Sequence, residues 1–332
     1  MRARLSPIRA PRVSDSILTV EERRGAMTSP TLSLIISTRG RTHELAKLLR
    51  SLSLQTMADF ETIIVDQNVD NRLCPILAEA PTSLRLRHVR TPHVTGLSRG
   101  RNHGWRLAQG SIVAFPDDDC WFPPTLLERA VNGLDSLDAD VVCGRAADET
   151  GRSINARFEK DAQWVRRDNI WTTQIEWMVF FRKAVLEKTA GYDESLGVGA
   201  ETPWGAYEGP DLLLRALQVG ARIYYDPELI GHHRELPITK PDADLVRKCR
   251  SYARGMGFVM NKHSFRAHVA AKWVLRPLLN AGLRAVFLEK DRAWFHLNVA
   301  LGRAEGYGRR VLLSAADYPP PGHHQNVSHH SV

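Results

Sequence analysis

Apolar and polar positions define two kinds of segment in the first part of the chain. Short apolar, β-branched runs at residues 31–37 (TLSLIIS), 60–65 (FETIIV), 84–89, 111–115 and 139–143 (ADVVC) have the length of buried strands. Between them we expect helices at 42–55, 98–108 and 124–134; in the first, Leu45, Leu48, Leu49 and Leu52 share one face. Strands alternating with such helices predict an α/β fold, a doubly wound, mostly parallel sheet with helices on both faces.

The pattern changes after residue 174. The apolar run at 175–181 (IEWMVFF) leads into a short helix at 182–188, and a glycine-rich loop at 197–209 follows. Pro210 predicts the start of a helix at 211–219, because proline and acidic residues favour the first helical turn. Residues 223–225 form a last short strand. Beyond Pro241 only helices are expected, with a kink or break at Pro277.

These elements divide the chain into four segments. Residues 1–27 form the first segment, which we expect to be disordered. Its first 26 residues carry six arginines against three acids and show no hydrophobic periodicity. A mis-assigned start codon upstream of Met27 would explain the presence of these residues. Residues 28–240 form the α/β domain and 241–315 an amphipathic helical extension. Residues 316–332, rich in proline, histidine and serine, are expected to be disordered.

Composition excludes several classes of protein. With 43% hydrophobic and 25% charged residues, the 332-residue chain is that of an ordinary globular protein. No stretch reaches the roughly eighteen apolar residues that a membrane-spanning helix needs. The four cysteines form no CxxC pair and have no zinc-site spacing, which indicates reduced thiols and a cytoplasmic protein.

Charge is concentrated in the C-terminal part. Of the net charge of +8, residues 241–332 supply 14 lysines and arginines against 6 acids, interleaved with tryptophan, phenylalanine and leucine. Such segments bind nucleic acids or anionic membrane surfaces. Because no nucleic-acid motif is present, we expect no nucleic-acid partner and a peripheral contact with the inner face of the cell membrane.

The strongest candidate for chemistry is the segment GSIVAFPDDDCWFPP at residues 110–124. Asp117, Asp118 and Asp119 follow a buried strand, and three adjacent carboxylates repel one another unless a divalent cation or sugar hydroxyls engage them. The alternative is a solvated acidic turn before a helix near Pro124. Ser37 and Asp66 also fall at the carboxyl ends of strands, where ligands bind in such sheets.

Seven landmarks occur in one order: LIISTRGR, IIVDQN, GLSRGRNHGWRLAQG, AFPDDD, GYDE, EGPDLLLRAL and PELIGHH. Over about residues 31–234 the chain resembles the family-2 inverting glycosyltransferases with the GT-A fold. The resemblance implies a nucleotide-sugar donor, with UDP-sugars favoured, and transfer to a hydroxyl of a glycan, polysaccharide or lipid-linked acceptor. It also implies Mn²⁺ or Mg²⁺ as the cofactor.

The same resemblance assigns residues to the donor and the metal. Asp119, Asp117 and His233 would hold the metal. The residues placed near the donor are Ser37, Thr38, Arg39, Asp66, Arg101, Asp117 and Asp118, with Arg101 near the phosphates. Two of them have simpler interpretations, Asp66 as a turn residue and Arg101 as a surface charge on its helix.

The general base is where the chain departs from the family. The family uses the second acid of an ED or EE pair, and here the pair reads Glu208-Gly209. We favour Glu208, because the positive end of the helix would keep its carboxylate ionised, with Asp211 as the next candidate. Alternatively both acids only favour the helix dipole. For the acceptor we expect Trp204, unless it is a core residue, and Glu201, which is also the third candidate for the base.

Two other functions remain open at this point. A sugar-nucleotide nucleotidyltransferase shares the scaffold. Those enzymes resemble one another in a glycine-rich loop directly after the first strand, whereas this chain has only the turn STRGR there. A degenerate glycosyltransferase that scaffolds a membrane assembly would account for Gly209.

Overall fold

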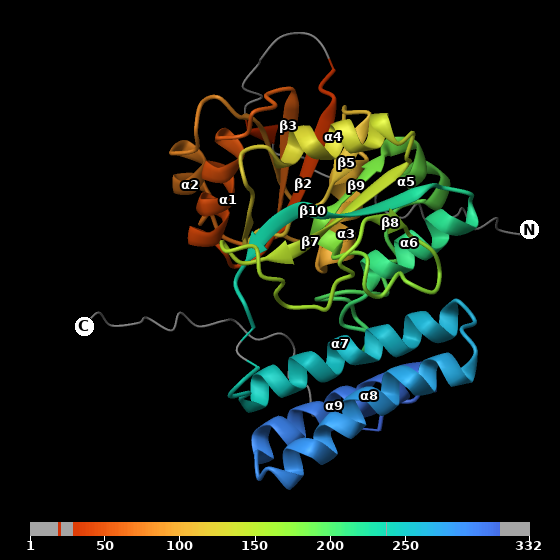
Figure 1. Ribbon diagram of the computed structural model, residues 1–332. Helices are drawn as coiled ribbons and strands as arrows, with labels where there is room; N and C mark the ends of the chain where they lie inside the picture. Colours follow the sequence, from red (N-terminus) through yellow and green to blue (C-terminus); the bar gives the residue numbers. More distant parts are fainter. Residues whose placement is uncertain (1–18, 21–28, 237, 313–332) are drawn as a thin grey trace, which may run out of the picture.

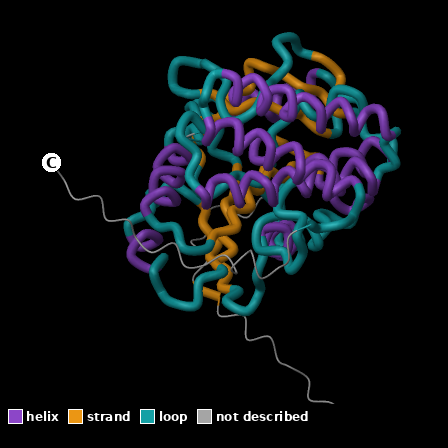
Figure 2. The backbone as a smooth tube through the Cα atoms, turned by 90° about the horizontal axis from the view of Figure 1, so that it is seen from below, coloured by secondary structure: helices purple, strands orange, loops and turns teal. Residues whose placement is uncertain are grey.

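The computed structural model describes residues 19–20, 29–236 and 238–312. An α/β domain forms the upper part of the molecule, and three long helices form a layer beneath it (Figure 1). Seen from below, these helices lie side by side (Figure 2).

One sheet runs through the α/β domain in the order β1-β4-β3-β2-β5-β9-β7-β10-β6, with β8 paired to β10. Its strands are β1 (Thr19–Val20), β2 (Leu32–Thr38), β3 (Phe60–Asp66), β4 (Arg85–Arg90), β5 (Ile112–Ala114), β6 (Cys120–Trp121), β7 (Val141–Ala147), β8 (Gln163–Trp164), β9 (Val179–Arg182) and β10 (Ile223–His233). Strands β2 to β5 are parallel, as are β7 and β10, but β9 lies antiparallel between β5 and β7. The sheet is therefore mixed, around the predicted parallel core.

Helices cover both faces of this sheet, which confirms the predicted α/β class. They are α1 (His43–Ser53), α2 (Cys74–Ala78), α3 (Leu97–Trp105), α4 (Leu126–Ser136), α5 (Lys183–Thr189) and α6 (Glu208–Gln218), with a 3₁₀ turn, η1 (Glu176–Met178). Because side chains alternate along a strand, Leu34 of β2 packs in one core with Leu48 of α1, and the neighbouring Ile35 packs in the other with Trp105 of α3.

Several boundaries differ from the sequence-based expectation. The last strand does not end at residue 225; it continues to His233, with an irregular register between Tyr225 and Ile230 that accommodates Pro227. Helix α6 begins earlier, at Glu208. Thr19 and Val20 pair with β4, so this part of the segment expected to be disordered forms a strand. The rest of that segment and residues 316–332 lie outside the described residues.

The C-terminal extension consists of α7 (Ala243–Lys262), α8 (Ala267–Val286) and α9 (Lys290–Tyr307). Helix α8 runs through Pro277, so the expected break is wrong; packing against α9 stabilises the helix despite the missing hydrogen bond. Helices α7 and α9 approach closely, and buried Glu305 of α9 pairs with Arg250 and Arg254 of α7, each with an N···O distance of 2.6 Å. The extension is thus a packed unit with its own buried charges.

Candidate active site

An acidic cluster lies where β5 ends. Asp117, Asp118 and Asp119 connect β5 to β6, and β6 pairs with the end of β10 so that His233 lies opposite Cys120. His233 Nε2 is consequently 3.0 Å from Asp119 Oδ1. Ligand atoms of Asp117, Asp119 and His233 all lie within 4.8 Å of one another. Two carboxylates and an imidazole fit Mn²⁺ or Mg²⁺, so the structure brings together the residues predicted to hold a metal.

Asp119 is held by Arg41 and His233. Arg41 Nη2 lies 2.7 Å from Asp119 Oδ2, and His233 contacts the other oxygen. Burial alone would raise the pKa of Asp119, but the hydrogen bond with His233 and the charge of Arg41 outweigh it and lower the pKa. Burial lowers the pKa of His233, but its bond to Asp119 reverses the effect and raises it. Asp119 is therefore ionised at neutral pH, as a metal ligand must be.

The middle aspartate of the motif points back to the first loop. Thr38 Oγ1 donates a hydrogen bond of 2.6 Å to Asp118 Oδ2, and Arg41 pairs with the other oxygen. Asp118 is buried. It therefore joins the acidic segment to the STRGR turn, and Arg41 of that turn contacts the acidic segment, which the sequence analysis missed.

The residues predicted for the nucleoside gather at the same sheet edge. Thr38 at the end of β2 pairs in register with Asp66 at the end of β3. Asp66 is 1% exposed and accepts hydrogen bonds from Asn68 N (2.9 Å) and, at 2.9 Å, from His88. Burial raises the pKa of Asp66, but the bonds from His88 and Asn68 prevail and lower it. The alternative of Asp66 as a simple turn residue does not account for this buried hydrogen-bond network. Arg39, also predicted to lie near the nucleoside, is exposed.

Arg101 of α3 is a buried centre of charge. Its side chain is 1% exposed, and its guanidinium lies 2.7 Å from Asp117, 3.3 Å from Glu176 and 3.3 Å from Glu208. The interpretation of Arg101 as a surface charge is wrong. Burial outweighs the attraction of Arg101 and raises the pKa of Asp117 to about 6. Arg101 thereby joins the acidic motif to two glutamates from distant parts of the chain.

Glu208 lies at the first position of α6 but is only 1% exposed. Burial, followed by the negative charge of Glu176, raises its pKa well above the ordinary value. Its surroundings therefore disfavour the ionised form of the carboxyl group. The argument for Glu208 as the base assumed a carboxylate that the helix end keeps ionised at an open entrance, whereas the structure buries Glu208 and raises its pKa.

Asp211 is enclosed by cations. Its carboxylate contacts Arg215 at 2.9 Å, Lys262 at 2.7 Å and His263 at 2.8 Å, and the residue is 0% exposed. Burial would raise its pKa, but the hydrogen bond from His263 and the charge of Arg215 lower it to about 2. Since Lys262 ends α7, this carboxylate joins α6 to the extension.

The two residues predicted to bind the acceptor have different surroundings. Trp204 stacks on Phe258 of α7, with ring centres 4.7 Å apart, and packs against the core. Glu201 is exposed, 3.7 Å from Arg99. The structure thus gives Trp204 the packing contacts of a core residue.

Residues 33–189 match the family model described as glycosyl transferase family 2. These residues form a glycosyl transferase family 2 domain. Its sequence is 23% identical over 258 residues to the glycosyltransferase AglE of Haloferax volcanii, covering 75% of this chain and 81% of that protein. An uncharacterized glycosyltransferase of Haemophilus influenzae is 33% identical over 104 residues, covering 31% of this chain and 34% of that protein.

Solved structures share the GT-A fold of this glycosyltransferase domain. TarS 1-349 of S. aureus in complex with UDP-GlcNAc superposes with a TM-score of 0.51 at 18% identity, covering 85% of this chain and 93% of that one. The mannosyltransferase PcManGT of Pyrobaculum calidifontis in complex with GDP-Man and Mn²⁺ has a TM-score of 0.59 at 16% identity, covering 84% and 88%. The family and fold together support a transferase.

Three further residues of the cluster escaped the sequence analysis: Glu176, Lys248 and Tyr252. Glu176 precedes β9 and is the one acid in an apolar run, so only its contact with Arg101 reveals it. Burial raises the pKa of Tyr252, and the charges of Glu208 and Glu176 add to the effect. Lys248 acts electrostatically on Asp119. Helix α7 of the extension therefore faces the acidic cluster of the glycosyltransferase domain.

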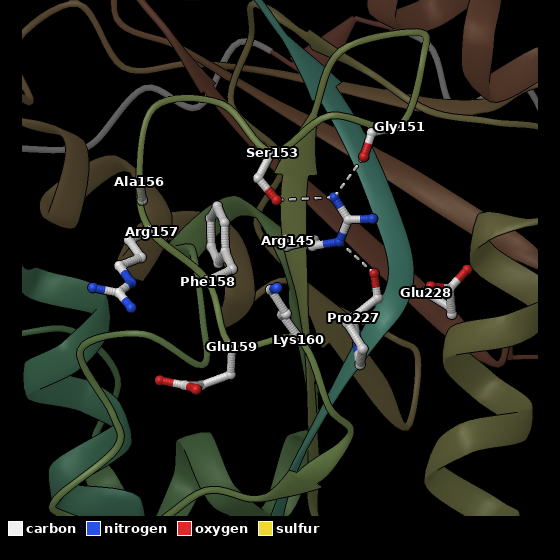
Figure 3. Close-up of a pocket in the computed structure, with 10 residues that line it drawn as sticks. All are labelled: Arg145, Gly151, Ser153, Ala156, Arg157, Phe158, Glu159, Lys160, Pro227 and Glu228. Atoms are coloured by element: carbon white, nitrogen blue, oxygen red, sulfur yellow. Dashed lines mark hydrogen bonds between the residues drawn. The ribbon is translucent and has the colours of Figure 1, made fainter.

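A separate pocket of about 530 Å³ lies beside β7 and β10 (Figure 3). Arg145 crosses it and donates to the carbonyl oxygens of Pro227 (2.5 Å) and Gly151 (3.0 Å) and to Ser153 Oγ (3.1 Å). The arginine thus holds the backbone around the pocket, and none of the lining residues belongs to the acidic cluster. We assign no ligand to it.

Proposed function

We propose that this protein is a metal-dependent inverting glycosyltransferase that moves a sugar from a nucleoside-diphosphate donor, with UDP-sugars favoured, to a hydroxyl of a glycan, polysaccharide or lipid-linked acceptor. The observation that carries the proposal is the cluster of Asp117, Asp119 and His233 at the carboxyl edge of a family 2 domain. Neighbours with this fold in complex with UDP-GlcNAc, or with GDP-Man and Mn²⁺, support it. The family match also argues against a nucleotidyltransferase.

Each part of the cluster has a task in this proposal. Asp117, Asp119 and His233 would hold Mn²⁺ or Mg²⁺, which when bound offsets the negative charge that develops on the diphosphate leaving group. Asp66, Ser37 and the turn that follows β2 would receive the nucleoside. Arg101, whose guanidinium is engaged by carboxylates, positions Asp117.

The test measures release of nucleoside diphosphate from a panel of UDP-, GDP- and dTDP-sugars with Mn²⁺, Mg²⁺ or EDTA. We expect turnover of at least one donor, stopped by EDTA. Donor binding without turnover toward water or any acceptor would instead support the scaffold, for which Gly209 at the family's base position is the specific observation.

We further propose that the extension contacts an anionic membrane surface on its cytoplasmic side, where a lipid-linked acceptor would be presented. No described helix is both long enough and apolar enough to cross a membrane. Helix α8, however, exposes Leu275 (52%), Leu279 (72%), Leu283 (52%) and Val286 (78%), which its helical spacing places on one side. Lys272, Arg276 and Arg284 lie along the same helix. An exposed apolar stripe with nearby cations is typical of interfacial helices.

The protein should sediment with anionic phosphatidylglycerol vesicles at low salt and be released at high salt. Exposed charges attract the surface over only ~8–10 Å at physiological ionic strength, so added salt weakens them further. L279E/V286E should abolish sedimentation, whereas Asp138→Asn, at an exposed turn between α4 and β7, should not change it. If the protein ignores anionic vesicles even at low salt, or light scattering shows that this stripe joins two copies, the proposal is wrong.

A further inference from the structure

Glu176 fills the space next to the position where the family carries its base. Glu176 begins η1, far in sequence from α6, yet the backbone N–H of Gly209 donates to Glu176 Oε2 at 3.2 Å. A Cβ added to Gly209 would lie 2.5 Å from Glu176 Cβ and 3.0 Å from Oε2. Side chains at positions 176 and 209 therefore exclude each other. In this chain the glycine is at 209 and the carboxylate comes from 176.

Among Glu176, Glu208 and Asp211, only Glu176 is accessible. Its side chain is 21% exposed, compared with 1% for Glu208 and 0% for Asp211. A general base must come within about 2.6–3.2 Å of the acceptor hydroxyl, directly or through one water. A fully buried carboxylate cannot approach an acceptor in this way, which leaves Glu176 among these three acids.

Arg101 places Glu176 beside the proposed metal ligands. Nη1 of Arg101 lies 3.3 Å from Glu176 Oε1, and Nη2 of the same guanidinium lies 2.7 Å from Asp117 Oδ1. A carboxylate oxygen that accepts one hydrogen bond keeps a lone pair for another partner. Glu176 can thus be held in place by Arg101 and Gly209 and still accept a proton.

We propose that Glu176 is the general base of the transfer reaction, in place of an acid at position 209. This rests on the proposed function. The acceptor hydroxyl loses its proton to the Glu176 carboxylate as its oxygen forms a bond to the anomeric carbon. The bond from that carbon to the diphosphate oxygen breaks on the opposite face, and the nucleoside diphosphate leaves with the electron pair. Water, as acceptor, requires the same base.

The first test compares Glu176→Gln with wild type. The amide keeps the size of the side chain and an oxygen to accept from Gly209 or Arg101, but it cannot take the proton. We expect release of nucleoside diphosphate from the active sugar donor to fall about 10²–10⁴-fold, while the thermal shift produced by that nucleoside diphosphate with Mn²⁺ is unchanged. Glu187→Gln, at an exposed position of α5, should behave as wild type.

The outcomes separate this inference from the proposed function. If wild type releases no nucleoside diphosphate from any donor, the proposed function fails and the inference with it. If wild type is active and Glu176→Gln retains its turnover, only the inference is overturned. The same conclusion follows if Glu208→Gln loses turnover while Glu176→Gln does not.

Azide provides the second test, because it attacks the anomeric carbon without losing a proton. Azide should restore nucleoside diphosphate release in Glu176→Gln and give a glycosyl azide of inverted configuration. It should not restore Asp119→Ala, whose defect does not concern the acceptor proton. A merely structural role of Glu176 would leave azide without effect, and that result overturns the inference.

Discussion

Asp119→Ala should abolish metal-dependent nucleotide binding and lower turnover about 10²–10³-fold or more, the equivalent of several kcal/mol of charge stabilisation. Asp119 is the carboxylate of the cluster that is both ionised and joined to His233. Its removal leaves Asp117 and His233 as the remaining side chains of the proposed metal site, which is too few for a hard cation that prefers oxygen ligands.

Thermal denaturation with UDP or GDP, in the presence and absence of Mn²⁺, measures this effect. A ligand at 100 times its dissociation constant adds about 2.7 kcal/mol to the stability of the folded state, and the variant should lose that increment. Asp138→Asn, which alters a 93% exposed partner of Arg222, serves as the matched control and should keep it. Equal nucleotide binding in Asp119→Ala, or binding indifferent to EDTA, would refute the metal site.

The long elements of the fold were predictable because their periodicity is local. Strands β2 and β3 are seven residues long, each with four apolar residues and every position buried, and helix α1 buries all four of its predicted leucines. Strands β6 and β8, with two residues each, carry no periodicity. The extent of β10 was missed because Asp226 and Pro227 interrupt its apolar pattern, although the strand accommodates them in a register irregularity.

The candidate site was predictable only where chemistry lies within a contiguous motif. The three consecutive aspartates and the histidine at the end of β10 are such signals, and the structure brings Asp117, Asp119 and His233 together. Burial of Arg101 depends on three carboxylates from separate elements, which no local pattern reveals. Gly209 was a signal of another kind, because a glycine where a carboxylate is expected leaves room for one from elsewhere.

Helix α7 shows why domain boundaries drawn from sequence do not separate functions. Its N-terminal half carries Lys248 and Tyr252 toward the acidic cluster, and Lys262 at its end pairs with Asp211 of α6. A Cβ on Gly255 would lie 2.0 Å from the carbonyl oxygen of Ala206, so the helix packs directly on the loop before α6. Basic residues of the extension, Lys248 and Lys262, therefore also interact with acids of the α/β domain.

Asp211→Asn should destabilise the protein by about 2–5 kcal/mol at neutral pH, because it leaves Arg215, Lys262 and His263 around a neutral group. The folded-state pKa of Asp211, about 2, lies below the ordinary value of 3.8. A carboxyl with a depressed pKa contributes its stability above the unfolded pKa and loses it as the pH falls through the folded one. The difference between wild type and variant should therefore be full above about pH 5 and shrink toward pH 2.

Urea denaturation across this pH range gives the free energies of unfolding, with Asp168→Asn as control. Asp168 is 74% exposed beside Arg166, so its replacement should change stability by no more than about 0.5 kcal/mol. Turnover per folded molecule of Asp211→Asn should stay near that of wild type, since the carboxylate is enclosed between α6 and α7. A stable Asp211→Asn that has lost turnover, together with an active Glu176→Gln, would instead favour Asp211 as the base.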